Sequence, residues 1–436
     1  MSDFSPQPAH SRAPARLDVM GGISDYSGGL CLEWPLEVAT TCRVTPHDEP
    51  VIIAQTQVPT RANWDAKIEV SLDELANLDA SRAREKFTGP GGWALYVIGA
   101  LVILRTEIGW RAPQGMSIAI ESQVPHGAGV SSSAALEVAV ITALNRAFRL
   151  GLDGHKIGRL AQKLENEIVG APCGVMDQLT VSLGRENHLL QLKCQPDIVE
   201  GFAAPPDGIE FWGIDSGVKH SVGGAAYGLA RCAAMMGRAL LSRLAPAAMR
   251  GPDGELYLAN ISPDVWRALR KPLPEQMSGA DFLRDYQHLD SVTTVDPDTV
   301  YPLRLATEHP IYEADRVARF ARLLRQMDEN PAARAALGRA AGELMIQSHF
   351  SYDHRCKLGS AETDLLVQLA REVGVEGGIY GAKITGGGAG GTVALMGDCQ
   401  LNTDLDATIE EIAARYARQS GCRPQIFRGS SDGANV

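Results

Sequence analysis

The most informative stretch of this 436-residue chain is Val124-Pro125-His126-Gly127-Ala128-Gly129-Val130-Ser131-Ser132-Ser133-Ala134-Ala135. A short β-type run at Ser117–Ile120 precedes it, and a strongly amphipathic segment, Ser133–Leu150, follows and ends at Gly151. This order predicts a strand, a tight glycine loop and a long helix. The first free N–H groups of such a helix, together with the positive end of its dipole, point at whatever the loop holds. The stretch therefore predicts an anion site, and nucleotide phosphates are common occupants of such sites.

A plain strand-to-helix turn with serine caps is the alternative for this loop. One serine is enough to cap a helix, so three in succession after two glycines favour a phosphate loop. A P-loop is excluded because no Gly-Lys-Ser/Thr follows. A spare serine hydroxyl beside the phosphates can ligate Mg²⁺. The candidate ATP-binding residues of the loop are Gly127, Ala128, Gly129, Val130, Ser131, Ser132, Ser133 and Ala134.

A second glycine run, Gly386-Gly387-Gly388-Ala389-Gly390-Gly391, formally matches the dinucleotide pattern GxGxxG. The residues that follow it, Thr392–Met396, have the pattern of a strand, whereas the dinucleotide fingerprint needs a helix there. A Rossmann oxidoreductase is therefore disfavoured. Either the run is a plain glycine-rich hairpin, or its backbone lies close against a bound substrate and the phosphate loop. The second interpretation adds Gly387 to the candidate ATP-binding residues.

The composition disfavours several classes of partner and site. The chain has 52 acidic and 41 basic residues, a formal net charge of -11, and no basic block, which disfavours nucleic acid and anionic membranes. Its eight cysteines form no CxxC pair, which disfavours a zinc knot or a disulfide framework. The N-terminus is polar, unlike a signal peptide, and the longest apolar stretch, Trp93–Leu104, is too short to span a bilayer. We therefore expect a cytoplasmic protein, a monomer or weak homo-oligomer, whose partners are small molecules.

The length exceeds the usual size of one hydrophobic core, so two lobes are expected. The predicted parts are a loose arm at 1–12, an N-terminal lobe at 13–210, a C-terminal lobe at 211–436, and within the latter a Pro- and Asp-rich insertion at about 244–310 on the substrate side. A strand at Phe211–Val218 opens the second lobe, and Ala314–His349 has a helical pattern. Strands and helices alternate without a regular βαβ rhythm, which favours an α+β fold over a doubly wound sheet.

Three charged side chains are candidates for phosphoryl transfer. This chemistry is mostly positioning and charge neutralisation, so it needs an acidic group near the attacking hydroxyl, a metal ion and a cation. Asp177, Glu165 and Arg16 could fill these places. A single acidic residue is most often a solvated surface charge, so the pattern alone predicts an anion-binding enzyme and leaves phosphoryl transfer as a hypothesis.

Five segments of the chain, in this order, resemble the GHMP kinase superfamily and specifically its galactokinase branch. They are Arg16 with Asp25–Gly29, Pro125–Ala139, Pro172–Gln178, Asp215–Ser221, and Lys383–Thr385 with the second glycine run. The resemblance covers nearly the whole chain from about residue 12. It implies a two-lobed α+β fold, with a ribosomal-S5-domain-2-like N-terminal lobe and a ferredoxin-like C-terminal lobe. ATP and a sugar would lie in the cleft between the lobes.

By motif position, the resemblance implies that Asp177 is the catalytic carboxylate beside the anomeric hydroxyl of the sugar. Arg16 would stabilise the transferring phosphoryl group and hold this carboxylate ionised. Whether Asp177 abstracts the proton or only orients the hydroxyl stays open. Ser133 and Glu165 match the family's Mg²⁺-ligating pair.

The same resemblance assigns residues to the two substrates. Asp25, Gly174 and Tyr227 fall in the sugar site. Trp93 falls where the family places residues around the adenine, and a plain core tryptophan is the alternative there.

The first motif departs from the galactokinase pattern. Galactokinases carry Gly-Glu-His-Thr-Asp-Tyr, in which the Glu binds the hydroxymethyl oxygen at C6 of galactose, whereas this chain has Gly21-Gly22-Ile23-Ser24-Asp25-Tyr26. A buried acidic group loses a hydrogen bond when the bound sugar has no C6 hydroxyl, and this loss penalises such sugars. This chain has no acidic group at the position, so the penalty is absent. An apolar Ile23 suits a galactose-like sugar without the C6 hydroxymethyl group, and L-arabinose in its pyranose form is such a sugar. Gly22 and Ile23 are therefore assigned to the sugar site.

Several segments are similar to the kinase domain of plant L-arabinokinases: Arg16–Gly28, Ser278-Gly279, Asp290–Val292 and Arg304–Glu313. This similarity implies an ATP- and Mg²⁺-dependent 1-kinase that converts L-arabinose to β-L-arabinose 1-phosphate. One alternative is a galactokinase acting on D-galactose or a C6-modified galactose-like sugar. Another is a non-catalytic sensor of sugar and ATP on the same fold. The complete serine loop, with Asp177 and Arg16, favours an enzyme over a sensor.

Overall fold

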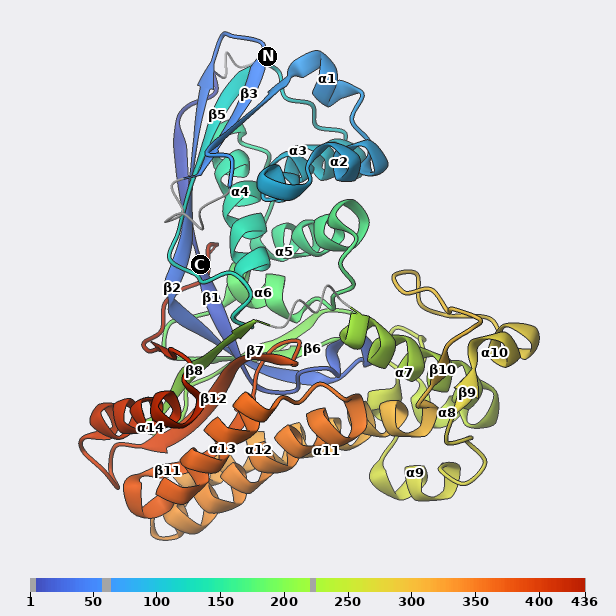
Figure 1. The fold of residues 1–436 in the computed structure, drawn as a ribbon, viewed down its shortest axis with the longest axis vertical. Helices are drawn as coiled ribbons and strands as arrows, with labels where there is room; N and C mark the ends of the chain where they lie inside the picture. The colour runs from blue at the N-terminus through green and yellow to red at the C-terminus, as the bar shows by residue number, and fades with distance from the viewer. Residues whose placement is uncertain (1–4, 57–63, 220–224, 436) are drawn as a thin grey trace.

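Two β-sheets organise the chain, which a computed structural model describes at residues 5–56, 64–219 and 225–435 (Figure 1). The first sheet has the order β4-β3-β5-β2-β6-β7, with β1 paired to β2. Its strands are β1 (Ala9–Met20), β2 (Leu30–His47), β3 (Val51–Thr56), β4 (Lys67–Ser71), β5 (Gly115–Ser122), β6 (Leu189–Lys193) and β7 (Ile198–Ala203). The β3–β5 pair is parallel and the other pairs are antiparallel.

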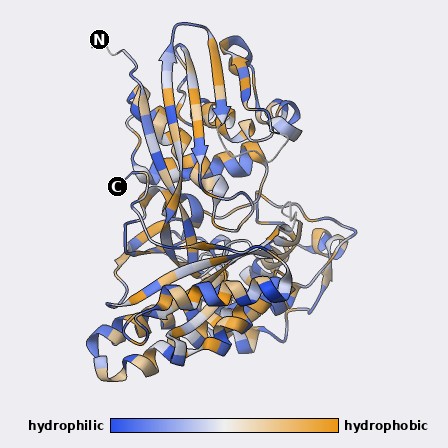
Figure 2. Ribbon diagram, turned by 60° about the vertical axis from the view of Figure 1, so that its left-hand side comes forward, coloured by the Kyte–Doolittle hydropathy of each residue, from blue (hydrophilic) through white to orange (hydrophobic). Residues whose placement is uncertain are grey.

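Helices cover one face of the first sheet (Figure 1). They are α1 (Leu72–Ala76), α2 (Ala80–Lys86), α3 (Ala94–Ile108), α4 (Ser132–Phe148), α5 (Gly154–Lys163), which continues as a π-helix (Leu164–Val169), and α6 (Met176–Leu183). Hydrophilic and hydrophobic bands alternate along the strands (Figure 2). In β2, for example, Cys42 and Val44 are buried while Thr41 and Arg43 are exposed. This alternation buries one face of the sheet and leaves the other to solvent.

The second sheet is antiparallel and has the order β11-β12-β8-β13. Its strands are β8 (Ile209–Lys219), β11 (Ile379–Ile384), β12 (Gly390–Asp398) and β13 (Gln425–Phe427). The main helices of this half are α7 (Ala225–Leu244), α11 (Leu303–Glu329), α12 (Arg334–Cys356), α13 (Ala361–Val373) and α14 (Leu405–Ser420). The chain passes from the first sheet to the second between Ala203 and Ile209. Two sheets with helices packed on them confirm the predicted α+β class.

Short elements fill the region between α7 and α11. They are α8 (Pro246–Met249), α9 (Pro263–Leu269), β9 (Met277–Ser278), α10 (Gly279–Asp285) and β10 (Val300–Tyr301). They share a hydrophobic cluster with α7 and α11 in which Trp266 and Phe282 are fully buried. This part lies at one end of the molecule (Figure 1).

Three sequence expectations need correction. Ala9–Arg12, predicted to belong to a loose arm, are part of β1 and pair with Thr41–Val44, because the strand continues beyond the apolar run; residues 1–4 lie outside the described part.

The helix predicted at Ala314–His349 is two helices, α11 and α12, which pack against each other. The first of them begins at Leu303, inside the predicted insertion, and Pro310 lies buried within it. Tertiary packing has overridden the helix-ending tendency of proline here.

The described helices include none that is both long enough and apolar enough to cross a membrane.

A close helix–strand approach gives a prediction for the fold. A Cβ at Gly342 of α12 would lie 1.9 Å from the carbonyl oxygen of Tyr380 in β11, and backbone atoms cannot move aside cheaply. We expect Gly342→Ala to lower the free energy of unfolding by about 1–3 kcal/mol, as overpacking does. Gly228→Ala in α7 is the matched control, since nothing lies within 4 Å of its added Cβ. Urea unfolding of both variants is the measurement, and equal effects would contradict the close approach.

Candidate functional site

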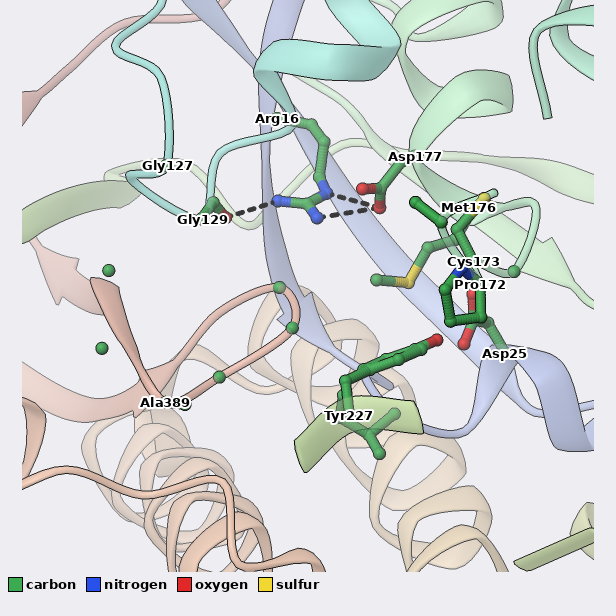
Figure 3. A pocket seen from close by; sticks show the side chains of 18 residues that line it. Arg16, Asp25, Gly127, Gly129, Pro172, Cys173, Met176, Asp177, Tyr227 and Ala389 are labelled. Carbon is green, nitrogen blue, oxygen red and sulfur yellow. Dashed lines mark hydrogen bonds and ion pairs between the residues drawn. The ribbon is translucent and has the colours of Figure 1, made fainter. Parts of the chain in front are cut away.

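A cavity of about 300 Å³ lies where segments of both halves meet, and half of the predicted site residues line it. It is lined by Arg16, Ile23, Asp25, Gly127, Gly129, Ala171, Pro172, Cys173, Gly174, Met176, Asp177, Tyr227 and the glycine run at residues 386–391. Figure 3 shows Arg16 between Gly129 and Asp177, with Asp25 and Tyr227 on the other side of the cavity.

Arg16 of β1, which is buried, forms an ion pair with Asp177, which lies in the first turn of α6 and is 24% exposed. Its Nε and Nη2 atoms donate to Oδ1 of Asp177 at 2.9 and 2.8 Å, and its Nη1 donates to the carbonyl of Gly129 at 2.9 Å (Figure 3). The Ser131 hydroxyl donates to the other oxygen of Asp177. Burial alone would lower the pKa of Arg16, but the charges of Asp177 and Glu33 raise it, so the side chain stays charged. A fixed cation and a carboxylate therefore face the cavity next to the glycine loop.

The glycine loop leads directly into the N-terminus of α4, as the sequence predicts. Gly127 and Gly129 have φ values of 74° and 75°, and Ser131, at φ 62°, adopts the left-handed conformation as well. No side chain caps α4, because the Ser131 hydroxyl is bonded to Asp177 instead. The first N–H groups of this helix therefore have no capping side chain, which is the arrangement of an anion site.

The second glycine run lies against the first. A Cβ at Gly386 would be 2.6 Å from the carbonyl oxygen of Gly129, and one at Gly391 would be 2.9 Å from that of Ala128. The Thr392 hydroxyl donates to the same Ala128 carbonyl at 2.7 Å. The run continues into strand β12, which is the opposite of a dinucleotide fingerprint. Of the two interpretations of this run, the structure favours the close backbone surface.

Asp25 is the second carboxylate of the cavity, and it is 6% exposed. Gly174 lies directly against it, since a Cβ there would be 1.6 Å from Oδ2 of Asp25. Burial, together with the charge of Asp177, raises the pKa of Asp25 to about 6. Its carboxylate is thus an acceptor with few competing partners, suited to hydroxyl groups of a ligand.

Ser133 and Glu165 meet beside the loop. The Ser133 hydroxyl hydrogen-bonds to the Glu165 carboxyl, and Gln178 Nε2 donates to Glu165 Oε2 at 2.7 Å. Burial raises the pKa of Glu165 to about 7. Within residues 5–56, 64–219 and 225–435, no group of three or more His, Cys, Asp or Glu side chains could hold a metal ion. Two oxygen ligands beside a phosphate loop nevertheless fit Mg²⁺, which takes one or two protein ligands and completes its shell with phosphates and water.

Comparisons with known proteins agree with this geometry. The GHMP kinases N terminal domain matches residues 95–185. The chain is 39% identical to the L-arabinokinase of Arabidopsis thaliana over 97% of its own length. It is 28% identical to the galactokinase of Streptomyces coelicolor over 95% of its length and 90% of that protein. Residues 95–185 therefore resemble the N-terminal domain of GHMP kinases. The chain spans 46% of the length of the plant L-arabinokinase.

The fold matches that of solved structures of other kinases. A crystal structure of Lactococcus lactis galactokinase complexed with galactose matches 98% of the chain with a TM-score of 0.75 at 20% identity, covering 95% of that protein. L. major mevalonate kinase in complex with R-mevalonate matches all of the chain with a TM-score of 0.58 at 14% identity, covering 100% of that protein. The two-lobed GHMP kinase fold expected from the sequence is therefore confirmed.

The other half of the predicted site residues do not line the cavity. Those in or beside the glycine loop are Ala128, Val130, Ser131, Ser132, Ser133, Ala134 and Glu165, and the remaining two are Gly22 and Trp93. Gly22 lies behind the cavity wall, where its backbone N–H donates to Asp18 Oδ1 at 3.1 Å, so the expectation that it faces a sugar directly needs correction. Trp93 is 6% exposed and packs in the main hydrophobic core. Its indole N–H donates to the Asp65 carbonyl at 2.9 Å. The structure thus gives Trp93 the core role, and an adenine contact stays a prediction.

The sequence did not indicate several residues that shape the site. Cys173, Met176 and Ala389 line the cavity although no predicted role attached to them. Tyr352 and Asp18 pack behind it. Cys173, Met176, Ala389 and Asp18 lie within the quoted motifs, which was the only sign that they belong to the site. No motif marks Tyr352.

The buried charge of Asp25 gives a pH-dependent prediction. Its pKa rises from the ordinary 3.8 to about 6 on folding, so the ionised form destabilises the folded state, fully above pH 6 and not at all below pH 3.8. We expect Asp25→Asn to raise the free energy of unfolding at pH 7 by up to about 3 kcal/mol. The gain should shrink as the pH falls and disappear near pH 4. Denaturant unfolding from pH 4 to 8 measures it, with the exposed Asp264→Asn of α9 as control. A gain that persists at pH 4 would rule out the buried charge as its cause.

Proposed function

We propose that this chain is an ATP-dependent sugar 1-kinase that phosphorylates the anomeric hydroxyl of L-arabinose and releases β-L-arabinose 1-phosphate and ADP. The observation that carries the proposal is the Arg16–Asp177 ion pair, which lies between the uncapped N-terminus of α4 and the cavity that holds Asp25. This ion pair places a cation and a carboxylate next to both the anion site and the cavity.

The nucleotide phosphates fit against the two glycine runs. Backbone N–H groups at the start of α4 and the positive end of its dipole favour negative charge there. Glycines in both runs allow a ligand to approach the backbone closely. Ser133 and Glu165 are the residues that would hold Mg²⁺, which, when bound, neutralises charge on the phosphates.

Phosphoryl transfer forms a bond between the anomeric oxygen and the γ-phosphorus and breaks the bond from that phosphorus to the β–γ bridging oxygen. Arg16 would offset negative charge on the phosphoryl group in transit, and it already fixes Asp177 with two hydrogen bonds. Asp177 would orient the anomeric hydroxyl and be the nearest acceptor for its proton. Ser131, bonded to the other oxygen of Asp177, restrains the direction of this carboxylate.

The sugar pocket supports a pentose. Asp25 can accept hydrogen bonds from sugar hydroxyl groups, and the lack of a side chain at Gly174 allows its carboxylate to lie directly against the backbone there. The facing wall contains Ile23, which is 1% exposed and lines the cavity, with Tyr227 and Ala389 packed on the same cluster. A ring carbon without a hydroxymethyl group suits such an apolar wall, and the plant relative at 39% identity is an L-arabinokinase.

The sugar is tested by a coupled ADP-release assay with L-arabinose and D-galactose side by side. We expect kcat/KM for L-arabinose to be higher by about tenfold or more, the usual effect of one misplaced group in an apolar pocket. The reverse preference would replace L-arabinose with D-galactose in the proposal. ATP binding without turnover of either sugar would point to a sensor.

Asp177→Asn tests the catalytic role. We expect kcat to fall by about 10²–10⁴-fold, the usual contribution of a positioned acid–base group. The asparagine keeps the shape of the side chain, so ATP affinity should change little, whereas the melting temperature should fall because the buried Arg16 loses the charge of its partner. Asp264→Asn, which removes an exposed carboxylate of α9, should retain full activity. Near wild-type turnover by Asp177→Asn would remove this residue from its proposed role.

A further inference from the structure

Tyr352 of α12 closes the space behind the apolar wall of the cavity. The side chain is fully buried. Its hydroxyl donates to Asp18 Oδ2 at 3.2 Å and also lies 3.2 Å from the carbonyl oxygen of Gly386. The ammonium of Lys383 in turn holds Asp18 Oδ2 at 2.6 Å, in an ion pair without solvent exposure. Tyr352 is thus fixed at once to β1 and to the second glycine run.

The hydroxyl of Tyr352 fills the space that a side chain at position 22 would need. A Cβ on Gly22 would lie 1.8 Å from this hydroxyl and 2.2 Å from Asp18 Oδ2. The carbonyl of Gly22 accepts a hydrogen bond from His309 Nε2 at 3.1 Å, and burial lowers the pKa of His309 to about 4, so the ring is neutral. The backbone at Gly22 cannot move away from Tyr352 without breaking these bonds.

Ile23 is held in front of Tyr352 by this arrangement. Its φ is 58°, which is an outlier for a β-branched residue and persists only where the surroundings impose it. The Ile23 side chain packs in one cluster with Tyr352, Leu358 and Ile384. The wall therefore has two layers: Ile23 faces the cavity, and Tyr352 prevents it from retreating.

We infer that Tyr352 is a specificity-determining residue that excludes sugars with a hydroxymethyl group on the carbon facing this wall. The inference rests on the proposed function and extends it to a residue that does not itself line the cavity. A hydroxymethyl group directed at Ile23 needs volume that Tyr352 occupies, and its hydroxyl would be buried without a partner. A pentopyranose carries only a ring CH₂ there and meets neither obstacle.

The test compares sugar preference in Tyr352→Leu and the wild type. We expect the ratio of kcat/KM for D-galactose to that for L-arabinose to rise by about tenfold or more, because the smaller side chain lets Ile23 move back. Both sugars are measured on the same preparation, so this ratio of kcat/KM values does not depend on the fraction of the enzyme that is folded. Tyr416→Leu is the matched control. Tyr416 of α14 is also fully buried and belongs to a separate hydrophobic cluster, and its hydroxyl donates to the Ser216 carbonyl at 2.8 Å. This control should leave the ratio unchanged.

If Tyr352→Leu does not fold, Tyr352→Phe replaces it in the same comparison. It retains the ring, removes the oxygen beside Gly22 and frees the Asp18 and Gly386 acceptors. We expect the same ratio to rise by about threefold or more, a smaller gain in keeping with the smaller volume removed. An unchanged ratio in the folded variants overturns the role of Tyr352 while the kinase proposal stands. Wild-type enzyme that turns over neither sugar, or that prefers D-galactose, overturns the proposed substrate and this inference with it.

Discussion

The positive charge of Arg16 inside the protein is the constraint on which the site depends. Its guanidinium is 2% exposed and lies between the carboxylates of Asp177 and Glu33 and the carbonyl of Gly129. A buried charge that loses its partners costs several kcal/mol. The segments that carry Asp177, Glu33 and Gly129 are therefore held against Arg16 in β1. The β1–β2 pairing shifts register between Pro14 and Arg16. Bulges of this kind re-aim side chains next to active sites, and here the re-aimed residue is Arg16.

The parts of the site that follow from local chemistry were predictable from the sequence. The glycines before an amphipathic helix predicted the tight loop and α4, and the strand pattern after the second glycine run disfavoured a dinucleotide fold. Asp177 and Glu165 were candidates from the sequence alone, and the family resemblance added their roles; no local pattern could show that they lie next to Arg16 and Ser133. The α+β class followed from the irregular alternation of strands and helices.

The parts that depend on long-range packing were not predictable in this way. Gly22 was expected to face a sugar, but it lies behind Ile23 because Tyr352, more than 300 positions later, fills the space beside it. Nothing in the sequence near Trp93 indicates that its indole N–H donates to the backbone carbonyl of Asp65. The start of α11 at Leu303, before a buried Pro310, likewise reflects packing rather than propensity.

The contact between the two glycine runs also limits how the site can change through substitution. At Gly386 and Gly391 any side chain would strike the backbone of the phosphate loop, and at Gly174 it would strike Asp25. These positions therefore tolerate almost no replacement, whatever the substrate. Ile23 and Tyr227 line the same cavity with their side chains, so its lining can vary there without a clash between the two glycine runs. The contact between the two glycine runs thus confines variation of the cavity lining to the positions that carry side chains.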